Sequence, residues 1–182
     1  MMFTTKEISR MAMFTALCAA TALLVRFGSA LVPFSLVPLA AVLAGAILGP
    51  RLGAISVLVY IVLGLLGIPI FAAPPYGGPL YVLNPTFGYL PGMALGAYLT
   101  GLILQQKTPW RLPGAVLAAT LALYLLGLPH LALIMAKVLH KPLSFGGVLL
   151  AGMTPFLIGD LLKAMVAVYL GELVRRRMGG GA

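Results

Sequence analysis

The sequence predicts an all-α integral membrane protein that folds as a bundle of six transmembrane helices. Hydrophobic residues make up 62% of its 182 positions and charged residues only 8%, whereas soluble domains carry roughly a quarter charged residues. The mean hydropathy is +1.10. Such a chain has too few charges to cover a surface in water, and its length suits one compact bundle. We therefore expect a single transmembrane domain over residues 1–182.

The net charge of +9 indicates an anionic partner, either nucleic acid or lipid. The lysines and arginines lie at the ends of apolar runs instead of along one soluble face. This distribution favours a lipid bilayer as the partner and argues against nucleic acid. The only cysteine, Cys18, lies in the middle of an apolar run, so no intrachain disulfide is possible and nothing indicates an oxidising compartment.

Six apolar runs have the length of a membrane span, or somewhat less. We expect helices over residues 8–25, 36–48, 52–66, 85–104, 114–136 and 155–174. Residues 71–84, between the third and fourth runs, are crowded with proline and glycine, so this stretch is not helical throughout. Residues 143–153 are apolar but rich in glycine, and we interpret them as a loop or a half-helix on the membrane surface.

The positive charges predict the orientation of the bundle. With both termini in the cytoplasm, eight lysines and arginines lie in cytoplasmic segments, and the external segments hold only Arg26, Lys137 and Lys141. This is the bias expected from the positive-inside rule. It places the Pro/Gly-rich stretch and the start of the last span together on the external side.

A charged pair within the last span, Asp160 and Lys163, is the first candidate for a ligand site. The two residues are three positions apart, so their side chains lie on one face of a helix. Charges at membrane depth are costly and normally face a cavity or each other. We interpret Asp160 as the only acidic residue within a span. A ligand or ion site is favoured over a structural link between helices, because Ser or Asn would form such a link at a lower cost.

Aromatic and polar residues gather at the same external level, in the Pro/Gly-rich stretch and at the start of the fourth span. They form either an interfacial aromatic belt or the wall of a ligand site. Asn84 precedes a proline where a helix cap is expected, so its side chain caps the helix and either does no more or also faces a ligand. The candidate binding residues of this region are Phe71, Tyr81, Asn84, Thr86 and Tyr89.

Small residues recur at every fourth position of the first span, at Ala12, Ala16 and Ala20. This spacing allows another helix to approach closely, either within the bundle or from a partner protein. His130 and His140 lack companions at metal-ligand spacing, so no metal site is expected. The chain contains no P-loop, GxSxG or HExxH motif. We therefore do not expect an enzyme, and no cofactor is implied.

Four stretches of the sequence carry motifs that are informative when they are taken together. They are Leu43-Ala44-Gly45 through Leu48-Gly49-Pro50-Arg51-x-Gly53, Tyr60-x-x-x-Gly64-x-x-Gly67-x-Pro69-x-Phe71-Ala72, Pro85-Thr86-x-Gly88-Tyr89-Leu90-x-Gly92 and Pro155-Phe156-x-x-Gly159-Asp160-x-x-Lys163-Ala164. In combination they resemble the BioY family, the biotin-specific S components of energy-coupling factor (ECF) transporters. The resemblance extends from the first span to the last. In two places the sequence departs from the family pattern, with Pro74-Pro75 in the loop and with Asn84 and Phe87 where glycines are common.

The resemblance implies a six-helix S-component fold that binds biotin on the external side of a prokaryotic plasma membrane. Energy would come from a transmembrane coupling protein with two ABC ATPases, and the small-residue pattern of the first span would contact that coupling protein. Asp160 and Lys163 would contribute to the biotin site. Two other functions remain open from the residues themselves: an ion-coupled secondary transporter of a small vitamin-like solute, and a membrane scaffold without a ligand.

Overall fold

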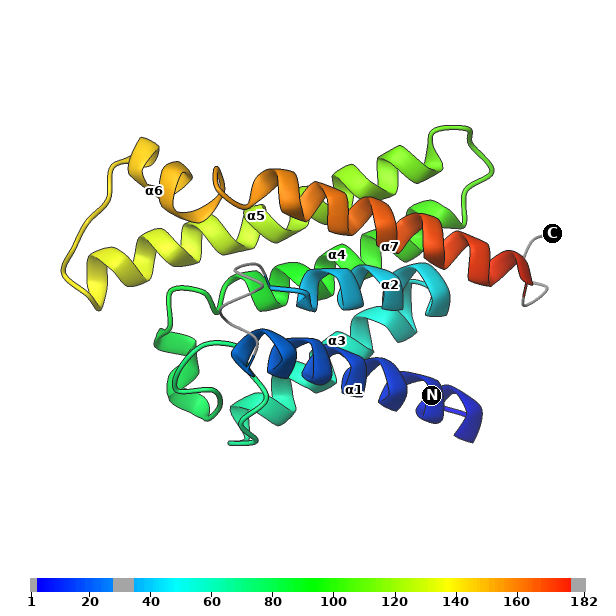
Figure 1. The fold of residues 1–182 in the computed structure, drawn as a ribbon, viewed down its shortest axis with the longest axis horizontal. Helices are drawn as coiled ribbons and strands as arrows, with labels where there is room; N and C mark the ends of the chain where they lie inside the picture. Colours follow the sequence, from blue (N-terminus) through cyan, green and yellow to red (C-terminus); the bar gives the residue numbers. More distant parts are fainter. Residues whose placement is uncertain (1–2, 28–34, 178–182) are drawn as a thin grey trace.

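The structure is a computed structural model that describes residues 3–27 and 35–177, and its regular elements over these residues are all helices. Figure 1 shows an elongated bundle in which the N-terminal end of α1 and the C-terminal end of α7 lie at the same end. The helices are α1 (Thr5–Phe27), α2 (Val37–Leu48), α3 (Pro50–Leu65), the 3₁₀ helix η1 (Pro79–Leu83), α4 (Tyr89–Leu104), α5 (Arg111–Lys137), α6 (Phe145–Gly152) and α7 (Leu157–Arg177).

Helix length and apolarity support two or three membrane spans among the described residues. Helices α1 and α5 are each long and apolar enough to cross a membrane, and α6 and α7 together pass the same test although a bend of 51° separates them. Helices α2, α3 and α4 are apolar but have 12, 16 and 16 residues. At a rise of about 1.5 Å per residue they are roughly 18 to 24 Å long, shorter than the hydrocarbon core of a bilayer.

The short helix α2 lies in the centre of the bundle, where it packs against α1, α3, α4 and α7. Gly45 allows α4 to come close: a Cβ atom built on it would lie 2.0 Å from the backbone oxygen of Ala97. Helices in membranes pack closely through such small residues. Gly49 has a φ of 84°, which favours glycine, and it connects α2 directly to α3, whose first residue is Pro50.

The expected helix boundaries agree with the structure to within three residues, except at the start of the fourth helix. Helix α4 begins at Tyr89 instead of residue 85, because Asn84 forms a local turn. Its Oδ1 atom accepts hydrogen bonds from the backbone N of Thr86 at 2.9 Å and from the Thr86 hydroxyl at 2.7 Å. Such turns compete with helix formation. The N-cap residue of α4 is Gly88, so the prediction that Asn84 caps this helix is wrong.

The glycine-rich segment before the last helix is helical. It forms α6, whose N-cap Ser144 accepts a hydrogen bond from the backbone N of Gly147 at 3.2 Å. This confirms a half-helix and rules out a loop over residues 145–152. A turn then separates α6 from α7, which begins at Leu157 instead of Pro155.

A second acidic side chain is buried in α7, so the interpretation of Asp160 as the only acid within a span is wrong. Glu172 is 8% exposed. Its Oε1 atom accepts hydrogen bonds from Arg111 at 2.7 Å and from Arg176 at 3.0 Å. Glu172 already lies within the expected last span, residues 155–174, although its place beside the terminal arginines is also typical of a solvated residue at a helix end. Its burial depends on the position of α5.

Candidate functional site

A cavity of about 430 Å³ lies inside the bundle, and every described helix contributes to its wall. Small-molecule sites in proteins have volumes of about 300–1,000 Å³ and are mostly apolar, with a few polar groups. Most of the lining side chains here are aliphatic or aromatic. Asp160 and Lys163 are the only charged groups among the described lining residues. The cavity therefore suits a small, largely apolar molecule with one or more polar groups.

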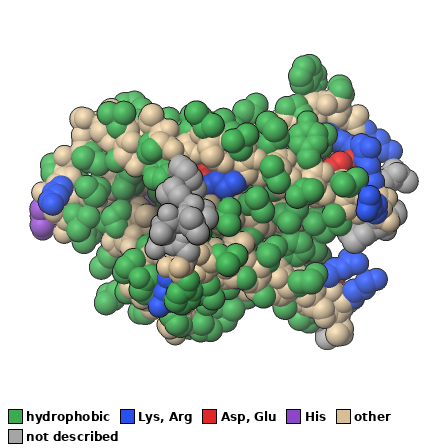
Figure 2. All heavy atoms as spheres, viewed as in Figure 1, with side chains coloured by type: hydrophobic (Ala, Val, Ile, Leu, Met, Phe, Trp, Pro, Cys, Tyr) green, Lys and Arg blue, Asp and Glu red, His purple; other side chains and the backbone are tan. Residues whose placement is uncertain are grey.

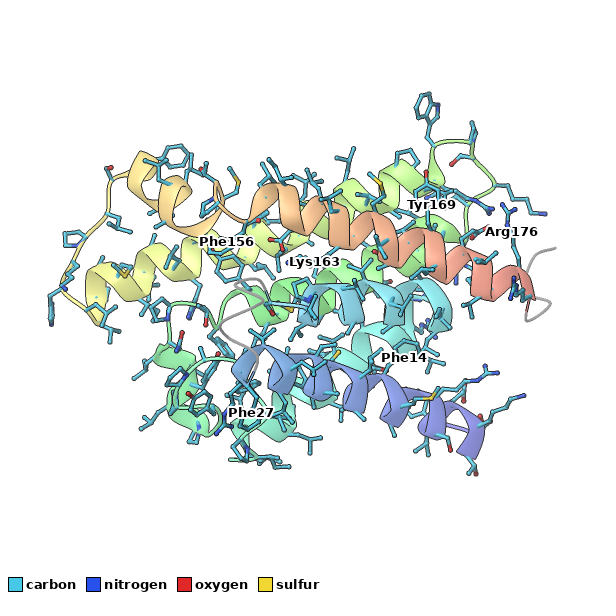
Figure 3. The ribbon with its side chains drawn as sticks, viewed as in Figure 1. Phe14, Phe27, Phe156, Lys163, Tyr169 and Arg176 are labelled. Atoms are coloured by element: carbon cyan, nitrogen blue, oxygen red, sulfur yellow. The ribbon has the colours of Figure 1, made fainter. Side chains whose placement is uncertain are left out.

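Asp160 and Lys163 form an ion pair at the start of α7, with Lys163 Nζ 2.5 Å from Asp160 Oδ1. Their side chains are 10% and 11% exposed, respectively. Figure 3 shows Lys163 on the side of α7 that faces α2, and its ammonium group donates to the backbone oxygen of Ser35 at 2.9 Å. The first turn of a helix also favours a negative charge such as that of Asp160.

Tyr124 of α5 supplies the third partner of this cluster, because its hydroxyl donates to Asp160 Oδ2 at 2.6 Å. A buried ion pair is tolerated only when further hydrogen bonds satisfy its remaining atoms. Tyr124 and the Ser35 carbonyl provide such bonds here. The cluster holds an oriented carboxylate and an ammonium group at the cavity wall, and these groups can accept and donate hydrogen bonds to a ligand.

One wall of the cavity is a stack of aromatic rings built by the loop after α3. The ring of Phe71, which is 1% exposed, lies edge-on to Tyr60 at 5.6 Å and tilted against Tyr81 at 4.3 Å. Gly64 makes room for it, since a Cβ atom there would lie 2.1 Å from the Phe71 ring. The Tyr60 hydroxyl donates to the Ile70 carbonyl at 3.2 Å. These contacts fold the loop back onto α3.

Two further tyrosines line the cavity from α4 and α5. The rings of Tyr89 and Tyr124 meet edge to face at 6.2 Å. The Tyr89 hydroxyl donates to the backbone oxygen of Gly152 at 2.8 Å and so ties α4 to the end of α6. Gly127 leaves space for the Tyr89 ring, because a Cβ atom there would lie 2.3 Å from it. Tyr89 is thus held by two helices beside the charged pair.

Asn84 and Thr86 hold the aromatic wall through hydrogen bonds, and Thr86 also lines the cavity. The hydroxyls of Thr86 and Tyr81 lie 3.4 Å apart, and the Asn84 amide donates to the Pro74 carbonyl at 2.8 Å. Burial raises the pKa of the Tyr81 hydroxyl above its usual value, so this group is protonated at neutral pH. Asn84 is absent from the described lining of the cavity, and it connects the Pro-rich loop to the turn before α4.

The structure brings six of the seven predicted binding residues to one cavity, and their contact with a ligand stays a prediction. They are Phe71, Tyr81, Thr86, Tyr89, Asp160 and Lys163. Tyr60, Tyr124 and Phe156 also line the cavity, although the sequence did not indicate them as binding residues. Tyr124 could have been identified from the sequence, because its hydroxyl is a polar group within an apolar span. Within residues 3–27 and 35–177, no three His, Cys, Asp or Glu side chains gather as they would at a metal site.

The small-residue ridge of α1 faces away from the bundle. Ala12, Ala16 and Ala20 are exposed, whereas the opposite face of α1 buries Phe14, Thr15 and Cys18. The hydroxyl of Thr15 donates to the backbone oxygen of Ser56 at 2.8 Å, which fixes α1 to α3. Of the two interpretations left open by the sequence, the exposed ridge favours contact with a partner over packing inside this chain.

Comparison with known proteins supports the family suggested by the motifs. The sequence model of the BioY family matches residues 1–180. The chain is 35% identical to the probable biotin transporter BioY of Pyrococcus horikoshii, over 92% of this chain and 94% of that protein. It is 30% identical to the biotin transporter BioY of Rhizobium etli, over 93% of each.

A crystal structure with a similar fold is also known. The structure superposes with a TM-score of 0.75 on the crystal structure of the S-component for biotin from an ECF-type ABC transporter, at 22% identity, covering 96% of this chain and 95% of that one. At this identity the likeness supports the fold alone. The family match extends over nearly the whole sequence, and on that ground the chain belongs to the BioY family.

Proposed function

We propose that this chain binds biotin in the 430 Å³ cavity and serves as the substrate-specific subunit of an ECF-type transporter. The observation that carries the proposal is a charged and hydrogen-bonded cluster on the wall of an aromatic cavity, in a member of the BioY family. Relatives from two organisms are named biotin transporters. The chain acts as one substrate-binding domain in a prokaryotic plasma membrane and is not itself an enzyme.

The chemistry of biotin suits this cavity. Its ureido ring carries two N–H donors and a carbonyl, its bicycle is apolar, and its tail ends in a carboxylate. Asp160 is an acceptor for the ureido N–H groups, and Lys163 attracts the biotin carboxylate or pairs only with Asp160. The rings of Phe71, Tyr81 and Tyr89 cover the apolar bicycle.

Isothermal titration of the isolated chain in detergent tests the proposal. We expect one biotin per chain, with binding that is lost when the cavity is filled by Ala72→Trp. Exposed Leu58→Trp on α3 is the matched control, and it should bind normally. No detectable heat with biotin in the folded wild-type protein, together with no biotin among co-purifying small molecules, would make the assignment untenable and favour a scaffold or another solute.

The exposed ridge of Ala12, Ala16 and Ala20 supports a second part of the proposal, contact with the coupling protein of the transporter and, through it, with two ABC ATPases. Replacing Ala12 or Ala16 by Trp blocks close approach of a partner helix. Co-purification with the coupling module and biotin uptake should fall, while biotin binding by the isolated chain persists. Loss of binding and assembly together would mean that the ridge packs internally.

The charge distribution supports six spans with both termini in the cytoplasm. Lysine and arginine side chains gather at the end of the bundle where α1 begins and α7 ends (Figure 2). The positive-inside rule assigns such an end to the cytoplasm. In a background without Cys18, a cysteine at Lys107 should resist external impermeant thiol reagents, and one at Tyr76 should react. Ready external labelling at Lys107 would contradict this topology.

A further inference from the structure

An arginine cluster lies at the end of the bundle far from Asp160, where α5 begins and α7 ends. Arg111 is the first residue of α5, and Arg175, Arg176 and Arg177 complete α7. Glu172 is the acidic partner among the described residues here, and a single oxygen, Oε1, accepts from both Arg111 and Arg176. The four arginines thus have one carboxylate among the described residues of this cluster, and it pairs with only two of them, so the cluster carries a net positive charge.

One guanidinium nitrogen of this cluster lacks an acceptor within the described part of the chain. The Nη1 atom of Arg175 is buried and has no hydrogen-bond partner there. Nearly all buried polar atoms in proteins are hydrogen-bonded, because leaving a charged donor unpaired is costly. The described residues therefore leave a place for a further acceptor at this position, and the excess of positive charge favours an anionic one.

The surroundings of the cluster indicate an amphipathic occupant. Trp110, which immediately precedes Arg111, is 76% exposed, and tryptophan is enriched at the membrane–water interface. On α7, Tyr169, Leu170 and Leu173 expose large apolar side chains in the turns just before the arginines. An anionic group at the arginines and an acyl chain along this apolar face are the two parts of a phospholipid.

We propose that Arg175, together with Arg111 and Arg176, binds the phosphate of an anionic phospholipid such as phosphatidylglycerol. Guanidinium groups bind phosphate oxygens through paired hydrogen bonds. The acyl chains lie along the exposed face of α7, and Trp110 marks the level of the headgroups. The bound lipid supplies the missing acceptor and fixes the ends of α5 and α7 to the membrane surface.

Native mass spectrometry of protein released from nanodiscs tests this site, with equimolar phosphatidylglycerol and phosphatidylcholine in the discs. We expect the wild type to retain phosphatidylglycerol preferentially, and Arg175→Gln to lower that preference about tenfold, the effect of one charged hydrogen bond. Exposed Arg51→Gln, at the start of α3, is the matched control and should behave as the wild type. Unchanged biotin binding by Arg175→Gln shows that the variant is folded.

Four outcomes would overturn the lipid site. Equal retention of both lipids by the wild type would show that no anionic lipid is selected. Equal losses in Arg175→Gln and Arg51→Gln would reduce the effect to diffuse surface charge. If inorganic phosphate displaces the lipid at millimolar concentration, or if Arg175→Gln impairs only assembly with the coupling module, the cluster binds a free anion or an acidic protein surface instead.

Discussion

Helix α7 carries two buried carboxylates with similar partners and different surroundings. Asp160 and Glu172 are both 8% exposed, and both are ion-paired to a base on their own helix, at i+3 and i+4 respectively. Glu172 has a second base, Arg111 from α5. Asp160 has instead a tyrosine hydroxyl from α5 and a place on the wall of the large cavity.

The comparison shows that burial and pairing do not by themselves identify a ligand site. A buried ion pair is tolerated wherever its hydrogen bonds are satisfied, and it is often structural. Asp160 differs because Lys163 and Tyr124, its two partners, line the same cavity. The carboxylate can therefore exchange or share its partners with a ligand, whereas the Glu172 cluster joins the ends of two helices.

Of the differences that we expect between Asp160 and Glu172, the largest is their effect on biotin affinity. Asp160→Asn replaces an acceptor oxygen by a donor, so a ureido N–H would face another N–H. Leaving such a buried group unpaired costs about 1–3 kcal/mol, which lowers affinity about 5- to 150-fold. Glu172→Gln should leave affinity within about twofold and should lower the melting temperature instead. Titration calorimetry measures the affinity of both variants, and thermal unfolding measures their stability. Equal losses of affinity in Asp160→Asn and Glu172→Gln would show that the two carboxylates do not differ in this way.

Measurements with two ligands, biotin and a biotin amide, distinguish between two possible roles of Lys163. Lys163→Met keeps the apolar stem and removes the charge. If the ammonium group meets the biotin carboxylate, affinity for biotin should fall about tenfold or more while affinity for a biotin amide changes much less. If it only neutralises Asp160, both ligands should weaken alike. Wild-type affinity in both Asp160→Asn and Lys163→Met would leave the pair as a structural link, like the Glu172 cluster.

Tyr124 tests whether orientation of the carboxylate matters. Tyr124→Phe removes the hydrogen bond to Asp160 Oδ2 and keeps the ring against Tyr89. The loss of one such bond corresponds to about 0.5–1.5 kcal/mol, or a 2- to 13-fold drop in biotin affinity. Tyr98→Phe, an exposed tyrosine of α4, serves as the control. An unchanged affinity in Tyr124→Phe would show that Lys163 alone positions the carboxylate.

The smallest expected effect concerns the loop that forms the aromatic wall. The guanidinium of Arg26, at the end of α1, lies 3.8 Å above the Tyr76 ring and donates to the Pro69 carbonyl at 3.3 Å. A partly exposed cation–π contact contributes about 0.5–1 kcal/mol. In Arg26→Gln, amide exchange at Tyr76 and Gly78 should therefore accelerate about 2- to 5-fold. Unaltered exchange there would show that the aromatic stack alone holds the loop.

Several features of the site could be predicted because they depend on local pattern. The i, i+3 spacing of Asp160 and Lys163 places them on one helix face. Because charged side chains are costly at membrane depth, their presence in an apolar span marks them as candidates for a ligand site. Phe71, Tyr81 and Tyr89 were found through their position at the external ends of spans and through the family motifs. The cap assigned to Asn84 failed because a side-chain turn and a helix start use the same residue types.

The sequence by itself determined that the chain is a helical membrane protein, because hydropathy and helix-length runs depend only on neighbouring residues. It also pointed to the BioY family and to the charged pair. Only the tertiary structure decided that Tyr124 completes the pair from 36 positions away, that Glu172 is buried against α5, and that the alanine ridge of α1 faces outward. These facts depend on how helices distant in sequence pack together, and the periodicity of one helix does not specify which of its neighbours it meets.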